Sequence, residues 1–268
     1  MDKNEVLEKI RSKITPGQEW MVDNIQYLTL TGSHAYGINN EDSDFDVYGF
    51  TIPPIEYVYA DNLLGFEGPP TFNQFEGKVT GKTKNECLDF TIYNITRYFK
   101  LVMENNPNMI DSLFTGKNCE LVVTDIARKV KDNRKLFLHK GSWPKFKGYS
   151  FSQLNKIRVK PEDRENPDRK LAIEKYGYDT QFAVHIFRLL DEVEQILTLG
   201  DIDLTRNREQ LKRVKEGYYK LEEIDKYFKE KELMLEKAYN ESTLPWGPRE
   251  KEIRELLVTC LEDFYENP

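Results

Sequence analysis

Two β-prone stretches enclose a short turn near the amino terminus, and together they require a sheet in this part of the chain. Residues 25–31 (IQYLTLT) and 46–52 (DVYGFTI) are rich in β-branched and aromatic residues, which favour strands. The first stretch leads directly into Gly32 and Ser33. Backbone N–H groups and a hydroxyl at such a strand-to-turn junction can hold an anion. The segment therefore predicts a sheet with an anion-binding turn at the end of one strand.

Three aspartates near this turn form a candidate metal site. Asp44 and Asp46 stand two residues apart at the start of the second strand, so both side chains point to the same side of the sheet. Like charges held this close repel, and hard carboxylate oxygens suit Mg²⁺ bound together with substrate phosphates. Asp89 lies between Leu88 and Phe90 in a third strand-like stretch, and burial of those two neighbours places it on the opposite face. Together with Asp44 and Asp46, this third carboxylate would complete a two-metal site for phosphoryl transfer. Without Asp89, the alternative for Asp44 and Asp46 is a solvated acidic turn.

Apolar periodicity predicts helices before and after these strands. Helical spacing covers residues 4–14, 92–102 and 125–138, and from Lys170 onward the chain has a predominantly helical pattern. An apolar stripe in this second half extends to about Leu199 and consists of Phe182, Ile186, Leu189, Val193 and Ile196. The second half of the chain is therefore predicted to be an all-helical unit.

Two segments do not fit a regular element. Residues 53–81 contain eight Gly or Pro residues interspersed with aromatics, which indicates an irregular excursion or a hairpin. Residues 143–154 (WPKFKGYSFSQL) interrupt the helical pattern with Pro144 and Gly148. We therefore predict a linker between the two halves of the chain.

Charge and cysteine content exclude several classes of protein. The chain has 39 basic and 46 acidic residues, a net charge of −7, which excludes a uniformly basic coat for nucleic acid. Between Arg128 and Lys170, however, the chain has 14 basic residues and only 5 acidic ones. Such an excess is typical of either a phosphate-binding surface or a solvated helix face with a linker. The three cysteines form no CxxC pair, which argues against a disulfide scaffold or a four-cysteine zinc site. With no apolar run long enough to span a membrane, we expect a soluble, cytoplasmic protein without a membrane partner.

The residues from Gly32 to Phe50 also carry a family resemblance. Their pattern, G-S-x-x-Y-G followed by S-D-x-D-x-x-G-F, resembles the nucleotidyltransferases of the DNA polymerase beta superfamily. More narrowly, the segments 106–114, 148–154 and 178–190 resemble the branch associated with RNA repair, so that the likeness covers about residues 27–217. The resemblance implies an α+β fold, with a small mixed-sheet catalytic domain at 1–138 followed by a mostly helical domain at 139–268. The basic linker would form the start of this second domain.

The resemblance implies roles for particular residues. Asp44, Asp46 and Asp89 are the expected catalytic and metal-binding carboxylates, with Mg²⁺ or Mn²⁺ as the cofactor. The expected nucleotide-binding residues are Gly32, Ser33, Ser43, Tyr149, Gln153, His185 and Arg188. His185 and Arg188 share a helical strip with Tyr178 and Gln181 beside the apolar stripe, where a guanidinium could hold a phosphate. A buried histidine is more often structural than catalytic. The chain departs from the family in having Gln181 where Lys is usual and Asp111 where Glu is frequent.

The reaction implied by the resemblance is transfer of a nucleoside monophosphate from an NTP, such as ATP, to an acceptor hydroxyl, with release of pyrophosphate. The favoured acceptor is the 3′ end of an RNA, because of the basic stretch and the family's association with RNA repair. Transfer to a protein or small-molecule hydroxyl is the alternative within enzymology. A non-catalytic nucleotide-binding module is the alternative outside it.

Overall fold

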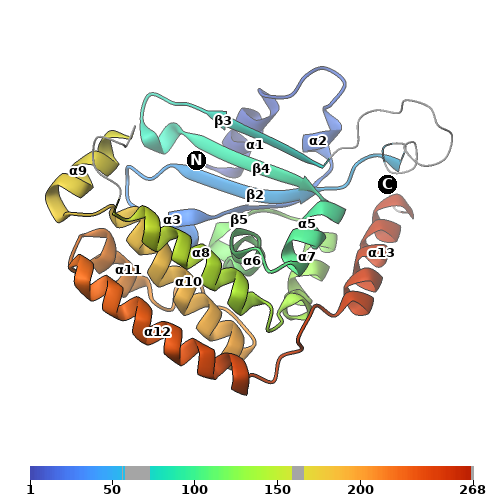
Figure 1. The fold of residues 1–268 in the computed structure, drawn as a ribbon. Helices are drawn as coiled ribbons and strands as arrows, with labels where there is room; N and C mark the ends of the chain where they lie inside the picture. The colour runs from blue at the N-terminus through green and yellow to red at the C-terminus, as the bar shows by residue number, and fades with distance from the viewer. Residues whose placement is uncertain (56, 58–72, 159–165, 267–268) are drawn as a thin grey trace. The chain divides into compact units, whose positions relative to one another are not determined.

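The computed structural model divides the chain into two compact units (Figure 1). The structure describes residues 1–55, 57, 73–158 and 166–266. Unit 1 consists of residues 1–103, 108–137 and 249–268, and unit 2 consists of residues 104–107 and 138–248. The change of unit after Phe137 lies next to the expected boundary at 138, but the last helix is grouped with unit 1. In the described residues, no helix is both long and apolar enough to cross a membrane.

Unit 1 is built on a five-stranded sheet with the strand order β3-β4-β2-β1-β5. The strands are β1 (Ile25–Leu30), β2 (Phe45–Thr51), β3 (Gln74–Val79), β4 (Leu88–Asn94) and β5 (Glu120–Val123). β2 and β4 pair in parallel, and the other neighbours pair antiparallel. This mixed sheet, together with the many helices of the chain, confirms the predicted α+β class.

Helices pack on both faces of the sheet. On one face, Val6 and Ile10 of α1 (Lys3–Arg11) join a buried cluster with Leu28, Val47 and Phe90 of the strands. On the other face, aromatic rings of β1, β2 and α5 pack against one another. The helices of this second side are α5 (Ile95–Met103), α6 (Pro107–Phe114), α7 (Asp125–Asp132) and α13 (Glu250–Glu266). Because both faces are covered over much of the sheet, strand residues of both parities are buried.

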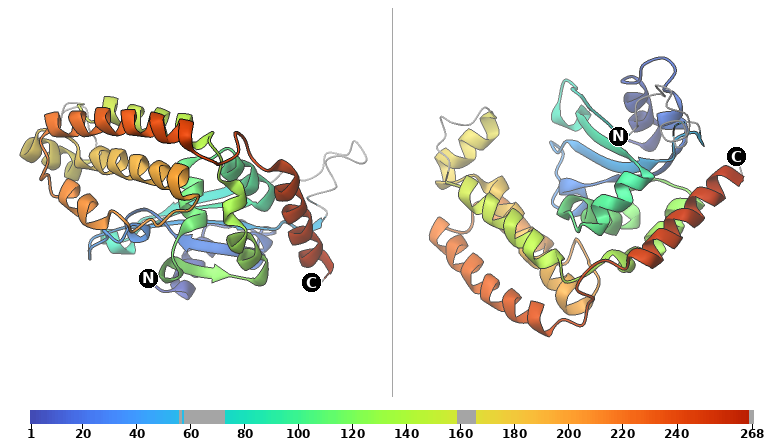
Figure 2. Two further views of the ribbon diagram at one scale, coloured as in Figure 1. Left: turned by 90° about the horizontal axis from the view of Figure 1, so that it is seen from below. Right: turned by 45° about the vertical axis from the view of Figure 1, so that its right-hand side comes forward.

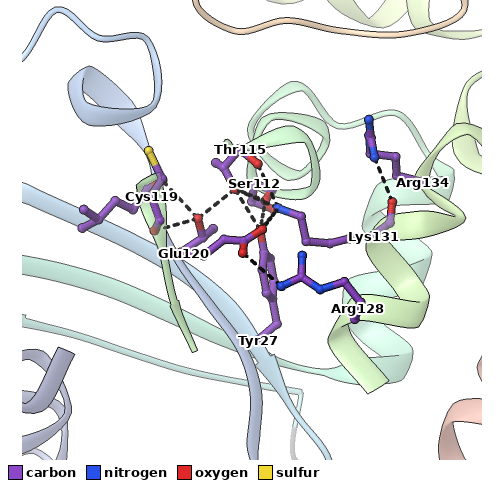
Figure 3. Close-up of polar contacts among 10 residues, drawn as sticks. Tyr27, Ser112, Thr115, Cys119, Glu120, Arg128, Lys131 and Arg134 are labelled. Atoms are coloured by element: carbon purple, nitrogen blue, oxygen red, sulfur yellow. Dashed lines mark hydrogen bonds and ion pairs between the residues drawn. The ribbon is translucent and has the colours of Figure 1, made fainter. Parts of the chain in front are cut away.

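A buried polar network ties β1, β5, α6 and α7 together (Figure 3). The ammonium of Lys131, on α7, donates to the Tyr27 hydroxyl at 3.1 Å and to the Thr115 carbonyl at 2.8 Å. It also forms an ion pair with Glu120 at 2.9 Å, and the other carboxylate oxygen of Glu120 lies 3.3 Å from Arg128. Burial acts against ionisation of Glu120, but the hydrogen bonds and charges of Lys131 and Arg128 lower its pKa.

The last helix, α13, is grouped with unit 1 because it packs against α5 and α7. Ile253, Leu256 and Cys260 form its buried side. Asp263 forms an ion pair with Lys129 on α7. These contacts are the physical reason why a division of the chain into two consecutive segments, 1–138 and 139–268, does not describe the compact units.

Unit 2 is helical, and α10 is its central element (Figure 2). Its helices are α8 (Ser142–Lys156), α9 (Pro167–Tyr176), α10 (Thr180–Leu199), α11 (Arg208–Lys215) and α12 (Leu221–Glu241). The Asp179 side chain caps the start of α10 by accepting from the N–H of Gln181, and Gly200 ends the helix in the left-handed conformation at φ 61°. The predicted apolar stripe from Phe182 to Ile196 is buried.

Two local predictions are wrong, and a third is confirmed in one of its alternatives. Residues 143–154 lie within helix α8 and form no linker: Pro144 is in the first turn, where a missing N–H costs nothing, and packing against α10 compensates for Gly148. The predicted helix at 92–102 starts only at Ile95, because β4 continues to Asn94. Within 53–81, residues 74–79 form strand β3, which pairs antiparallel with β4 and so agrees with the hairpin alternative, while 58–72 lie outside the described residues.

Candidate active site

Two of the three aspartates stand side by side on neighbouring strands. Asp46 of β2 and Asp89 of β4 are direct partners in the parallel register, so their side chains lie on the same face of the sheet. Asp44 precedes β2 by one residue and has the same parity as Asp46. The flanking residues Leu88 and Phe90 are buried in the cluster beneath α1, which leaves Asp89 on the opposite face. The structure therefore brings the three predicted carboxylates to one end of β2 and β4.

The carboxylates are close enough to perturb one another. Burial raises the pKa of Asp46 to about 6, and the charges of Asp44 and Asp89 contribute in the same direction. Asp89 is more open, since 53% of its side-chain surface is exposed. Crowded carboxylates of this kind bind protons or cations more readily than an isolated aspartate does.

A lysine that the sequence analysis did not identify also belongs to this site. Lys78 on β3 is the antiparallel partner of Asp89, and its Nζ lies 3.2 Å from Oδ2 of Asp89. The sequence prediction for residues 53–81, an irregular excursion or a hairpin, gives no register and therefore does not place Lys78. The signal was present in the alternation of Q-F-E-G-K-V, in which every second residue is half-buried and the others, including Lys78, are exposed.

The turn after β1 fits closely against Asp46. Gly32 has φ +58°, and a Cβ at this position would lie 2.5 Å from Oδ2 of Asp46. Any side chain at Gly32 would therefore meet both backbone strain and a clash with the carboxylate. The N–H of Thr31 donates to the Asp46 carbonyl at 2.8 Å. Ser33 follows in the short helix α3 (Gly32–Ala35), so the predicted Gly-Ser turn lies directly beside the aspartates.

Ser43 has a local role in the loop that leads to Asp44. Its buried hydroxyl donates to the Asn40 side chain at 2.9 Å and accepts from the Asn40 N–H at 2.9 Å. These hydrogen bonds shape the loop, whereas nucleotide binding by Ser43 stays a prediction.

The other predicted nucleotide-binding residues belong to unit 2. Tyr149 and Gln153 are one turn apart on α8, and 40% of the Tyr149 surface is exposed. On α10, Arg188 is buried and pairs with Glu192 at 3.4 Å. Burial lowers the pKa of His185, and the nearby charge of Arg169 lowers it further. Their contact with nucleotide stays a prediction.

The two departures from the family pattern have different environments. Asp111 is buried and accepts a hydrogen bond of 2.6 Å from the hydroxyl of Tyr36, the tyrosine of the G-S-x-x-Y-G motif. It therefore links α6 to the residue that follows α3. Gln181 is exposed in the first turn of α10. Tyr178, from the same strip, is buried and donates to the Tyr219 carbonyl at 2.7 Å.

The carboxylates of Asp44, Asp46 and Asp89 suit a hard divalent cation, although they do not form a complete coordination site. Among the described residues, no three His, Cys, Asp or Glu side chains are assembled as a metal site. Asp89 is instead paired with Lys78. The donors are carboxylate oxygens on adjacent strands, and their mutual repulsion contributes to the raised pKa of Asp46. Oxygen donors with excess negative charge are what Mg²⁺ and Mn²⁺ prefer.

Several cations of the predicted basic stretch are paired with acids. Lys131 is buried in the unit 1 network, Lys147 pairs with Glu232 and Glu236, and Arg158 pairs with Asp225. The stretch is also divided between the two units at Phe137. The positive charge counted along the sequence is therefore partly balanced by local acids and belongs to both units.

The crowding of the carboxylates predicts a pH dependence of the metal-free protein. Because the folded-state pKa of Asp46 is raised from 3.8 to about 6, its contribution to stability is present at low pH and is lost as the pH rises through 6. The loss amounts to about 2 to 3 kcal/mol between pH 4 and 7. Unfolding of the wild type and of Asp46→Asn in chelator should therefore diverge with pH, with the variant gaining relative stability. Parallel curves would contradict the assigned environment of Asp46.

Comparison with known proteins gives a family match over almost the whole chain. The model of the RNA repair pathway DNA polymerase beta family matches residues 3–261. An uncharacterized 38.9 kDa protein of the nrdC-mobD intergenic region of Enterobacteria phage T4 is 29% identical over 133 residues, which are 48% of this chain and 37% of that protein. The matched part therefore spans little more than a third of the phage protein.

Among solved structures, a nucleotidyltransferase-like protein from Exiguobacterium sibiricum 255-15 aligns with 87% of this chain and 77% of its own. The sequence identity is 10% and the TM-score is 0.32.

Proposed function

Since the chain belongs to the RNA repair pathway DNA polymerase beta family and is a nucleotidyltransferase of that type, we propose a metal-dependent transfer to an RNA 3′ hydroxyl. The donor would be an NTP, and the products would be the extended RNA and pyrophosphate. The observation that carries the proposal is the parallel register of Asp46 with Asp89, with Asp44 at the same end of β2. The choice of RNA rests on the family.

In this proposal, the three aspartates hold one or two Mg²⁺ or Mn²⁺ ions. The bound cation would neutralise charge on the phosphates as the bond between the α-phosphorus and the departing pyrophosphate breaks. Gly32 and Ser33 would hold the NTP phosphates through their N–H groups and the serine hydroxyl. Asp89 is more exposed than Asp46, and it would accept the proton of the attacking hydroxyl as the new phosphorus–oxygen bond forms.

The experiment for the proposed function compares acceptors directly. The protein is incubated with each of the four α-³²P-labelled NTPs, Mg²⁺ or Mn²⁺, and an RNA ending in a 3′ hydroxyl. We expect label on the RNA, none in the presence of chelator, and none on the same RNA ending in a 3′ phosphate. Label on protein alone would replace RNA by a protein acceptor. NTP binding without release of pyrophosphate to any acceptor would favour the non-catalytic module.

A further inference from the structure

Lys78 has no role in the reaction proposed above, although its ammonium lies against the carboxylates. Its Nζ is 3.2 Å from Oδ2 of Asp89, and 62% of the Lys78 side chain and 53% of the Asp89 side chain are exposed. Solvent-exposed ion pairs of this kind contribute little to the stability of the fold. Stability is therefore a weak reason for a lysine at this position.

The register of three strands fixes where Lys78 lies. Lys78 of β3 is the partner of Asp89 of β4, and Asp89 is in turn the partner of Asp46 of β2. Partners in adjacent strands share a face, so the three side chains form a row across the sheet. β3 is the edge strand of the described sheet, and the long lysine side chain is free to swing toward solvent.

The charge of Lys78 acts on the whole group of carboxylates. Its ammonium lies 3.2 Å from Oδ2 of Asp89, and Asp89 is the direct register partner of Asp46. One ammonium and three carboxylates leave two formal negative charges, which one divalent cation balances. A second cation at Asp89 would have to compete with the Lys78 ammonium for the carboxylate.

We propose that Lys78 is a displaceable counter-ion of the metal site. It holds the Asp89 carboxylate while no cation is bound, and it leaves Asp89 when a divalent cation takes its place. Lys78 is thus a positioning residue that lowers the affinity of the Asp89 position for metal in the absence of nucleotide. Once displaced, the ammonium is available to the phosphates that accompany the metal in an NTP complex. This inference rests on the proposed function, because it requires the aspartates to bind metal.

The test measures metal binding without turnover. Mn²⁺ is titrated into the full-length, metal-free protein at pH 7.5 without nucleotide, and free Mn²⁺ is read from its electron paramagnetic resonance signal. We expect Lys78→Met to bind Mn²⁺ about threefold to tenfold more tightly than the wild type, because a competing positive charge has been removed. Lys78→Arg, which keeps the charge, should stay within about twofold of the wild type. Lys100→Met, which removes an exposed lysine of α5, should change nothing.

The outcomes separate this inference from the proposed function. Equal or weaker Mn²⁺ binding by Lys78→Met, with binding by the wild type that is lost in Asp46→Asn, overturns the counter-ion role and leaves the metal site in place. Wild-type protein that binds no more Mn²⁺ than Asp46→Asn overturns both. Tighter binding by Lys100→Met to the same extent would also overturn the inference, since the effect would then follow net charge alone.

Discussion

Asp46→Asn is expected to abolish nucleotidyl transfer while leaving the fold intact. Asparagine has nearly the same shape as aspartate but cannot supply a charged ligand, and stabilisation of transition-state charge by a bound metal amounts to several kcal/mol. We therefore expect a fall in the transfer rate of at least about a thousandfold. The measurement is incorporation of labelled nucleotide at saturating NTP, with Mg²⁺ and with Mn²⁺.

The same substitution should have the opposite effect on stability. Burial and the charges of Asp44 and Asp89 disfavour an ionised Asp46 in the metal-free protein. Removing its charge relieves this repulsion, so Asp46→Asn should unfold at an equal or higher temperature than the wild type in chelator at pH 7.5. A loss of activity combined with a gain of stability is typical of a functional carboxylate and not of a structural one.

Asp42→Asn provides the matched control for this prediction. Asp42 is exposed in the same acidic loop, two residues before Asp44. Its substitution should reduce the transfer rate by no more than about twofold, because charges in open solvent are screened. Equal losses of activity in the two variants would point to the general charge of the loop. An active Asp46→Asn would refute the assignment of the catalytic centre.

The placement of the aspartates could be predicted because it depends on local alternation. Apolar residues on either side of Asp89 indicate which face of a strand it occupies, whatever the neighbouring strand is. The two-residue spacing of Asp44 and Asp46 likewise places both side chains on one face, whatever the neighbouring strand is. The sequence pattern does not predict that β2 and β4 are parallel neighbours, because strand pairing depends on residues far apart in the chain.

Lys78 and helix α8 were missed for a different reason. In both segments, Gly and Pro indicate breaks in regular structure by composition, whereas tertiary packing decides their actual effect. Gly77 lies in β3 where a Cβ would be 2.8 Å from the Phe90 ring, so the glycine permits close packing of the strand. Pro144 lies in the first turn of α8, where it is tolerated. Composition alone does not distinguish these positions from turns.

The helical residues illustrate a limit of periodicity. The spacing correctly gives α10 a buried apolar stripe, but it does not select the partner of each polar side chain. Arg188 was expected to bind phosphate, and the structure pairs it with Glu192 one turn later. That acid stands at the i+4 position, so the ion pair could have been considered from the sequence. A polar strip beside a core is therefore a weak indication of a ligand until its internal partners have been examined.

Lys131→Met is expected to produce a large loss of stability in unit 1. The Lys131 ammonium is buried and contacts the Tyr27 hydroxyl, the Thr115 carbonyl and the Glu120 carboxylate (Figure 3). Removing one member of a buried ion pair costs about 3 to 5 kcal/mol, because its partner keeps an uncompensated charge. Arg128 remains near Glu120, so we expect about 3 kcal/mol. Calorimetry is the appropriate measurement, since it can resolve separate transitions of two units.

Two further variants distinguish the buried network from charge in general. Lys129→Met, on the same helix, removes a more exposed lysine that pairs with Asp263, and it should cost much less stability than Lys131→Met. Combining Lys131→Met with Glu120→Gln removes both charges of the buried pair and should recover part of the loss, giving a coupling energy of about 1 to 3 kcal/mol. If Lys131→Met costs no more than Lys129→Met, or if the two losses simply add in the double variant, the network does not hold β1, β5 and α7 together. The sheet that carries the aspartates would then depend on its apolar faces alone.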